Sequence, residues 1–470
     1  MNRLLLLVVL LCSACSADPH VGSPIVPAEP SFTGKGELVS IRERIALGDR
    51  IASDWWMLFA SKPLDNLIHT AISGNYALSA ARETLAEANE AVKASEGHLL
   101  PQASIGAAAG RQKYGAALFG PANFTIPPFN YYEAGPMLSW TPDLFGGQHH
   151  AVELQKALAQ RKAHLLDATY LALTGSVVET SLEIASSNAE ISAIQAILKT
   201  DRKTLELVQD AYEIGSVSRS DLLSARARLL SDQSLLPSVQ QRLASARHRL
   251  AILEGKTPAG WVPPSISLED FRLPGKLPVA LPSELARRRP DILAAEDNLQ
   301  AASAVLGIAT ANLYPGITLT ANMLQEALTP AGIFRGTATA WSMAAGISTN
   351  LFDGGALSAE KREARDAYNA ALASYRQTIL DAFGNVADAL TALEADDNSV
   401  STLQSEAATA KSSADLDLAS YEEGAIGLLQ VQERQHEFLN AKLALVRSEH
   451  RRFVDCARLF LALGGSPLRR

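Results

Sequence analysis

The stretch Tyr212-Glu213-Ile214-Gly215-Ser216-Val217 returns later in the chain as Tyr421-Glu422-Glu423-Gly424-Ala425-Ile426, and this repetition decides the fold class. The same offset of 209 positions relates Leu250–Gly255 to Leu459–Gly464, with no gap needed. A period of this length exceeds the roughly 20 to 50 residues of a solenoid repeat. The sequence therefore predicts one architecture built from two similar halves.

The repetition extends upstream to a pair of glycine-rich stretches. Leu144-Phe145-Gly146-Gly147 returns as Leu351-Phe352-Asp353-Gly354-Gly355. Each stretch follows a segment with the pattern of a strand and precedes a long helical pattern, and glycine permits the tight turn between them. We therefore expect strand-to-helix turns at Gly146, Gly147, Gly354 and Gly355.

The composition favours long helices and argues against several classes of function. The 470 residues carry a formal net charge of −8, and aromatic residues make up only 6%. An acidic chain without a basic block is not expected to bind nucleic acid, because phosphate groups require a basic surface. The sequence has no nucleotide-binding glycine loop, no zinc-binding helix motif and no nucleophile elbow. We expect a protein that is not an enzyme and has no cofactor or metal.

The N-terminal residues have the pattern of an export signal followed by a lipid attachment site. Arg3 precedes the apolar run Leu4–Leu11, which is too short to remain as a membrane-spanning helix. Small residues stand directly before Cys15, as they do before a cysteine that is lipidated after cleavage, although Cys12 occupies a position where leucine is usual. We expect a signal peptide over residues 1–14 and a lipidated tether over residues 15–50. The alternative is ordinary cleavage after Ala17.

Four segments have the pattern of strands, two in each half of the chain. They cover about residues 102–113, 131–141, 316–325 and 341–351. In the second half apolar and small polar residues alternate strictly, and each segment has about the length of a tilted membrane strand. Four strands cannot close a barrel, and lipid does not tolerate an open sheet edge. Either several chains share one barrel, or two soluble hairpins cap a helical body.

Long helical patterns fill most of the remaining chain. In the second half Tyr368, Leu372, Tyr375 and Ile379 recur in steps of three and four. Helices with such a narrow apolar stripe need neighbours on both sides. Polar residues interrupt the stripe near Ser187-Asn188 and again at Asp396-Asp397-Asn398, which predicts helical hairpins with arms of about 40 residues. The first repeat then covers residues 51–260, a linker covers 261–280, and the second repeat covers 281–466.

Several motifs are specific enough to suggest a family. Arg289-Pro290-Asp291-Ile292 and its spacing to Leu313-Tyr314-Pro315-Gly316 are the most distinctive. Further matches are Leu281-Pro282-Ser283-Glu284-Leu285, Trp140-x-x-Asp143-Leu144-Phe145-Gly146, Tyr421-x-x-Gly424 and Leu461-Ala462-Leu463-Gly464-Gly465. Over about residues 50–466 the chain resembles the outer-membrane factor family of TolC-like efflux channels, in its lipoprotein branch. One departure is Leu429–Gln435, which replaces a Leu-Asp-Ala-Gln run that is common in the family.

The resemblance implies a homotrimer in the cell outer membrane. Three chains with four strands each would share one twelve-stranded β-barrel in the outer-membrane lipid, continued by a long α-barrel through the periplasm. The implied fold class is thus mainly α with membrane β. The implied function is that of a passive exit duct for small toxic compounds, which works with a periplasmic membrane-fusion adaptor and an inner-membrane transporter of the resistance-nodulation-division class.

In this family the helical turns form the closed periplasmic end of the channel. The turns expected here would place Asp396 and Asp397 at a candidate gate, and Asn188, Glu190 and Asn398 at candidate hairpin tips. Three copies of an acidic pair around one axis would favour cations. The alternative is that both aspartates are solvated or cap a helix.

Two further functions share parts of this pattern. A type I protein secretion duct would have the same architecture but would pass unfolded polypeptide. A structural periplasmic lipoprotein would have no pore. Because a wide conduit needs no specific pocket, the sequence does not specify which compound is exported.

Overall fold

The structure, a computed structural model, describes residues 31–33, 44–48, 51–114 and 127–464. The described residues form two compact units. The first comprises Leu85–Lys162 and Ala295–Tyr375, and the second comprises described residues of Ile25–Thr84, Ala163–Ala294 and Arg376–Arg470. Each unit takes segments from both halves of the sequence. The two halves are therefore repeats rather than separate domains.

The regular elements of the described residues are mostly helical. The helices are α2 (Lys62–Gly74), α3 (Tyr76–Gly97), α4 (Gly147–Glu213), α5 (Arg219–Gln233), α6 (Leu235–Leu253), α7 (Pro282–Leu285), α8 (Pro290–Ala311), α9 (Ala356–Glu422) and α10 (Leu428–Ala462). The strands are β1 (Ile45–Leu47), β2 (Gln102–Gln112), β3 (Phe129–Trp140), β4 (Leu277–Val279), β5 (Gly316–Ala327) and β6 (Thr339–Ser348). Among the described helices, none is both long enough and apolar enough to cross a membrane.

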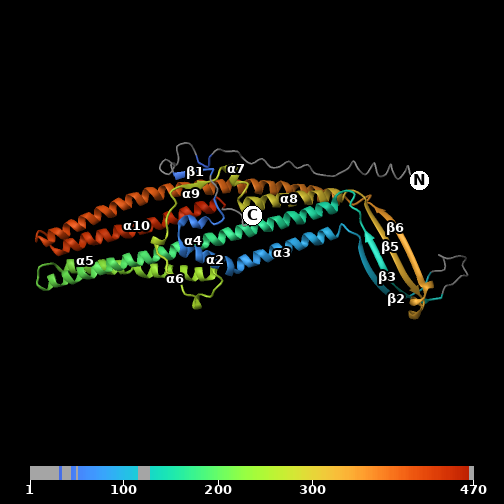
Figure 1. The fold of residues 1–470 in the computed structure, drawn as a ribbon, viewed down its shortest axis with the longest axis horizontal. Coiled ribbons are helices and arrows are strands. Elements are labelled where there is room, and N and C mark those ends of the chain that lie inside the picture. Colours follow the sequence, from blue (N-terminus) through green and yellow to red (C-terminus); the bar gives the residue numbers. More distant parts are fainter. Residues whose placement is uncertain (1–30, 34–43, 49–50, 115–126, 465–470) are drawn as a thin grey trace. The chain divides into compact units, whose positions relative to one another are not determined.

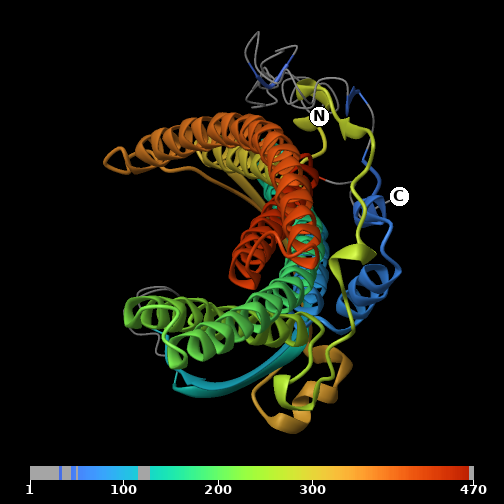
Figure 2. The same ribbon diagram turned by 90° about the vertical axis from the view of Figure 1, so that its left-hand side faces the viewer.

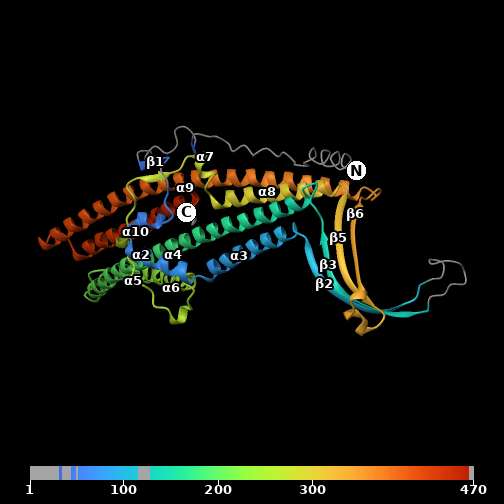
Figure 3. The same ribbon diagram turned by 45° about the vertical axis from the view of Figure 1, so that its right-hand side comes forward.

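The first unit contains a four-stranded antiparallel sheet in the order β2-β3-β5-β6 (Figure 1). Figure 3 shows its two hairpins, β2–β3 from the first half of the chain and β5–β6 from the second. The four strands predicted from the sequence are confirmed, with their ends displaced by no more than a few residues. Because β3 pairs with β5, one sheet joins the two halves.

The second unit has a hydrophobic core in which distant segments of the chain meet. The ring of Phe460 in α10 lies 6.0 Å from that of Trp55 and 6.1 Å from that of Phe59, between centroids. A short parallel pair of strands, β1 and β4, lies beside this core. A smaller apolar cluster, which includes Ile194 and Leu439, joins α4, α6 and α10. These contacts fix the helical hairpins of one chain to each other.

Those hairpins are α4 with α5 and α9 with α10 (Figure 2). Helices α4 and α9 each have 67 residues, a length of about 100 Å. Both run without interruption through the positions where the sequence predicts turns, so the prediction of 40-residue arms is wrong. A break does occur between α5 and α6, at Ser234. Pro237 explains it, since proline has no N–H to donate to the carbonyl four residues earlier.

Candidate functional site: strand faces and helix turns

The strand register collects apolar side chains on one face of the sheet. The cross-strand pairs on this face include Ile105 with Pro136, Leu138 with Ala321, Trp140 with Leu319, Met323 with Trp341, Ala321 with Met343, and Ile317 with Ile347. Several of these side chains are largely exposed in the single chain: Ile105 83%, Trp341 72% and Met343 77%. A continuous exposed apolar face marks a surface that contacts lipid or another protein.

Much of the opposite face of the sheet is small or polar, although it also carries Tyr131, Met137 and Leu324. Ser139 lies opposite Gln102 and Thr320, and Asn322 lies opposite Ser342. The hydroxyl of Ser342 donates to Oδ1 of Asn322 at 3.1 Å. Such a face suits contact with water. The sheet thus has the apolar and polar sides of a membrane β-strand arrangement.

The two outer strands of this sheet leave backbone groups unpaired. Among the described residues, β2 pairs only with β3, and β6 pairs only with β5. Each outer strand therefore presents a row of free N–H and C=O groups along one edge. Such an edge is a template for pairing with another chain.

Glycines form both strand-to-helix turns at the expected positions Gly146, Gly354 and Gly355, whereas Gly147 is the first residue of α4. Gly146, Gly354 and Gly355 have φ values of +82°, +67° and +87°, a backbone region that other residues adopt only at a cost. Asp353 accepts hydrogen bonds from the backbone N–H groups of Leu357 (2.9 Å) and Gly355 (2.8 Å), which lower the pKa of its carboxyl group. The carboxylate thereby caps the N-terminus of α9.

The helical hairpins turn at Gly215 and Gly424, and not at the tip positions predicted from the polar runs. Gly215 has a φ of +75°, and Gly424 has a φ of +79°. After α4 the N–H of Ser216 donates to the carbonyl of Ala211 at 2.9 Å, as in a Schellman motif, and the second hairpin has the equivalent bond. The repeated Tyr-x-x-Gly stretch was the available signal, because glycine is the usual residue just beyond a helix end.

Glu190 lies in the interior of α4 and joins three helices. Its buried carboxylate accepts hydrogen bonds from Nη2 of Arg242 on α6 at 2.8 Å and from Nε of Arg447 on α10 at 2.9 Å. The amide of neighbouring Asn188 reaches the carbonyl of Ile266 at 3.5 Å. The polar run that resembles a turn is therefore an ion-pair site between helices. Its partners lie far away in the sequence.

Asp396 and Asp397 lie inside α9. Asp397 forms ion pairs with Arg44 and, at 3.5 Å, with Nη1 of Arg452. Asp396 is buried next to Asp455. Burial and the Asp455 carboxyl group raise the pKa of Asp396 to about 6.

The positions assigned to the gate and the hairpin tips need correction. Helix α9 continues to Glu422, about 40 Å beyond Asp397 at 1.5 Å per residue. The prediction that Asp396 and Asp397 stand at a hairpin end, as do Asn188, Glu190 and Asn398, is therefore wrong. Polar residues interrupt an apolar stripe both at turns and where they face buried ionic partners. Periodicity alone does not separate these two cases.

The Arg289-Pro290-Asp291 motif has a structural role. Nη1 of Arg289 donates to the carbonyl of Ala462, the last residue of α10, at 2.8 Å. Its Nε and Nη2 bind the Asp291 carboxylate at 2.9 and 2.7 Å. The guanidinium thus satisfies a free carbonyl at the end of α10 and ties it to the start of α8. Cys15, the expected lipidation site, lies outside the described residues.

A family profile described as "Outer membrane efflux protein" matches residues 67–256 and 281–465. The chain belongs to the outer membrane efflux protein family. The two matched segments fall within the two sequence repeats, so both halves contribute to the family architecture. This family membership agrees with a sheet that has one apolar and one polar face.

Individual members of the family support the same assignment. The pyoverdine export outer membrane protein OpmQ of Pseudomonas putida is 30% identical over 420 residues, which cover 87% of this chain and 87% of OpmQ. Nodulation protein T of Rhizobium leguminosarum bv. viciae is 27% identical over 459 residues, which cover 97% of this chain and 92% of the relative. The solved outer-membrane channel OprN matches with a TM-score of 0.83 at 26% identity, covering 95% of this chain and 99% of that one. This outer membrane efflux protein has the TolC-like channel fold.

Proposed function

We propose that three copies of this outer membrane efflux protein form the passive exit duct of a tripartite efflux pump. The observation that carries the proposal is the four-stranded sheet with an exposed apolar face, a polar face and two unpaired edges. Lipid does not satisfy the backbone groups of an open edge. Four strands are too few to close on themselves. Pairing of the edges between chains resolves both problems.

The sequence repeat supports a definite contact between neighbouring chains. Within one chain, Phe145 stacks on Tyr314 with centroids 4.8 Å apart and planes inclined by 10°. The repeat relates Phe145 to Phe352, and it relates Tyr314 to Leu100. Phe352 is 92% exposed and Leu100 is 63% exposed. Placing Phe352 of one chain against Leu100 of the next reproduces the internal contact and buries both side chains.

Cysteine crosslinking tests this contact. A Leu100→Cys, Phe352→Cys double variant, treated in the membrane with a short bis-maleimide, is expected to give covalent dimers and trimers on a denaturing gel. Each single variant is the matched control and is expected to remain monomeric. The native Cys456 thiol is buried and does not interfere. A monomer mass in native mass spectrometry, or no difference between double and single variants, would refute the shared sheet.

Lipidation of Cys15 would anchor the N-terminus of each chain in the membrane. The support is the signal pattern of residues 1–15. Mass spectrometry of the N-terminal peptide is expected to find an acyl-modified cysteine at position 15. A mature chain that is cleaved after Ala17 and carries no acyl group would contradict lipidation. It would leave the channel proposal intact.

Curated relatives suggest the class of exported compound. One is named for pyoverdine export and another for toluene efflux, so we infer that the cargo is a small molecule. The chain itself supplies a conduit without catalysis, and the energy comes from an inner-membrane transporter of the resistance-nodulation-division class, coupled through a periplasmic adaptor. Deletion of the gene is expected to increase sensitivity to several compounds in a toxic-compound panel. Unchanged sensitivity with loss of a secreted polypeptide would favour a type I secretion duct.

A further inference from the structure

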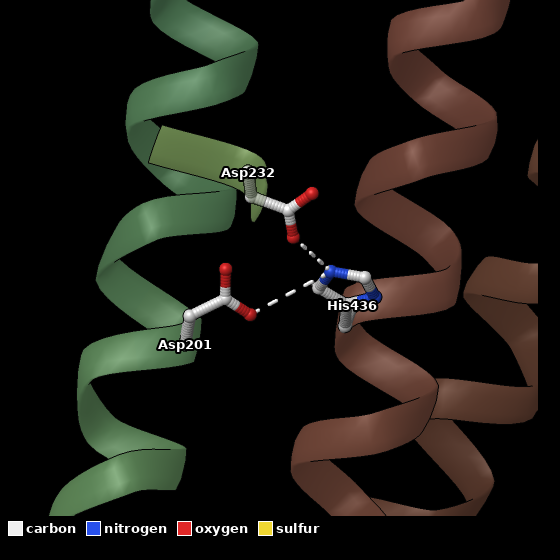
Figure 4. A group of neighbouring side chains, drawn as sticks. All are labelled: Asp201, Asp232 and His436. Carbon is white, nitrogen blue, oxygen red and sulfur yellow. Dashed lines mark hydrogen bonds and ion pairs between the residues drawn. The ribbon is translucent and has the colours of Figure 1, made fainter. Parts of the chain in front are cut away.

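Three side chains from three helices converge between the helical hairpins of the second unit (Figure 4). Asp201 comes from α4, Asp232 from α5 and His436 from α10. Nε2 of His436 lies 2.7 Å from Oδ2 of Asp232 and 3.6 Å from Oδ1 of Asp201. One ligand atom from each residue lies within 4.8 Å of the others. Because the residues are far apart in the sequence, no spacing motif signals this cluster.

Asp201 has a carboxylate oxygen that the chain leaves unsatisfied. Its side chain is only 2% exposed, and Oδ2 has no hydrogen-bond partner. In Figure 4 the Asp201 oxygen that carries no dashed line points toward the side of the cluster where Asp232 lies. A buried carboxylate oxygen next to a second carboxylate is unfavourable unless a cation or a proton satisfies it. The burial of Asp201 and the direction of its free oxygen therefore suit a site that holds a cation or a proton.

We propose that Asp201, Asp232 and His436 bind one divalent transition-metal ion of the Zn²⁺ type, which joins the two helical hairpins. Metal–ligand bonds of about 2.0–2.2 Å place tetrahedral ligand atoms roughly 3.4 Å apart. Nε2 of His436 lies 2.7 Å from Oδ2 of Asp232 and 3.6 Å from Oδ1 of Asp201, on either side of this value. Small side-chain rotations therefore suffice to bring the ligand atoms to metal-binding distances. One imidazole nitrogen with two carboxylate oxygens suits Zn²⁺ or Co²⁺, whereas Ca²⁺ requires six or more oxygen ligands.

Two neighbouring side chains fit this arrangement. The amide nitrogen of Asn440 lies 3.0 Å from Nδ1 of His436. When Nε2 binds the ion, Nδ1 carries the proton, and a flip of the Asn440 amide presents its oxygen as the acceptor. Asn440 is thus a positioning residue. Arg228 also acts electrostatically on Asp201. Its single positive charge does not neutralise both carboxylates, so the site keeps a net negative charge that attracts a metal ion.

Metal binding to the purified full chain tests the proposal independently of transport. The protein is prepared without a polyhistidine tag, stripped with EDTA and titrated with Co²⁺, whose visible absorption reports its ligands. We expect one ion per chain, displaced by Zn²⁺. His436→Gln and Asp201→Asn are each expected to weaken Co²⁺ binding by roughly 100-fold, and Asn440→Ala by roughly 10-fold, as for outer-shell partners of other metal sites.

His248→Gln is the matched control, because His248 is an exposed imidazole on α6. It is expected to bind Co²⁺ like the wild type. Thermal unfolding in EDTA shows that each variant is folded, and Zn²⁺ is expected to raise the midpoint of the wild type and of His248→Gln only. If the wild type binds no more metal than His436→Gln, the cluster is a structural ion pair and the proposal fails. Equal loss in His248→Gln would also overturn it.

Discussion

Replacing Met343 by arginine tests whether the apolar face of the sheet contacts lipid. Met343 lies in the middle of β6, opposite Ala321, and its side chain is 77% exposed in the single chain. On a lipid-facing strand, arginine near the bilayer midplane costs about 2–4 kcal/mol. Three copies in a trimer would cost roughly 6–12 kcal/mol, which is comparable with the whole stability of a folded domain. We therefore expect Met343→Arg to prevent assembly in the membrane.

The next residue provides the matched control. Ala344 lies opposite Thr320, on the polar face of the same strand. Ala344→Arg adds the same side chain one position along but places it in water, where a substitution typically changes stability by about 0.5 kcal/mol or less. We expect this variant to assemble normally. Its channels in planar bilayers are expected to shift toward anion selectivity relative to wild type, because three positive charges then line the pore.

The assay compares the two variants in isolated outer membranes. Trimers are quantified on gels run without heating, and total protein is measured after heating. The expected result is a large loss of trimer for Met343→Arg and wild-type levels for Ala344→Arg. Equal trimer levels would refute contact between this face and lipid. Loss of the Ala344→Arg trimer alone would show that the two faces are assigned the wrong way round.

Three further predictions concern the second unit. Gly215→Ala is expected to destabilise the protein by about 1–2 kcal/mol, because its φ of +75° is unfavourable for other residues. Gly384 lies inside α9, where an added Cβ would meet open space, so Gly384→Ala is expected to stabilise the protein by about 0.5–1 kcal/mol. Chemical unfolding of both variants checks that their free energies of unfolding change in opposite directions. Burial raises the pKa of Cys456 to about 12, so a maleimide is expected to label it only after denaturation, and rapid labelling of the native protein would contradict its burial. Burial raises the pKa of Asp396 to about 6, above the value of about 3.9 in the unfolded chain. The folded protein therefore has its full stability below pH of about 3.9, where the carboxyl group is neutral in both states, and loses stability as the pH rises through 6 and the buried group ionises. Asp396→Asn is therefore expected to stabilise the protein by roughly 1 kcal/mol at pH 8, after allowance for solvent screening, and to have little effect at pH 4; equal effects at both pH values would contradict the buried charge.

Local patterns predicted the elements of this fold well. The alternation of Ile317, Leu319 and Ala321 with Thr318 and Thr320 located β5, because side chains on a strand point alternately to its two faces. The glycines at 146 and 354 located the ends of the strand segments, because their backbone conformation excludes most other residues. Such features depend on neighbouring residues only. One sequence therefore suffices to find them.

The turns of the helical hairpins were misplaced for a physical reason. Glu190 and Asp397 resemble turn residues in the sequence, but their carboxylates pair with arginines on other segments of the chain. The sequence offers no means of knowing which distant arginine is near. The glycines that do form the turns, Gly215 and Gly424, stand in the repeated stretch itself.

The sequence by itself determined the duplication, the four strands and the apolar side of each strand in the second half. Periodicity is a local property of the backbone, and it survives without any knowledge of neighbours. Only the tertiary structure decided that β3 pairs with β5, and that the apolar sides of all four strands share one face. It also brought Asp201, Asp232 and His436 together. Register and side-chain clusters arise between segments far apart in the chain, where the packing of whole helices and strands sets the distances.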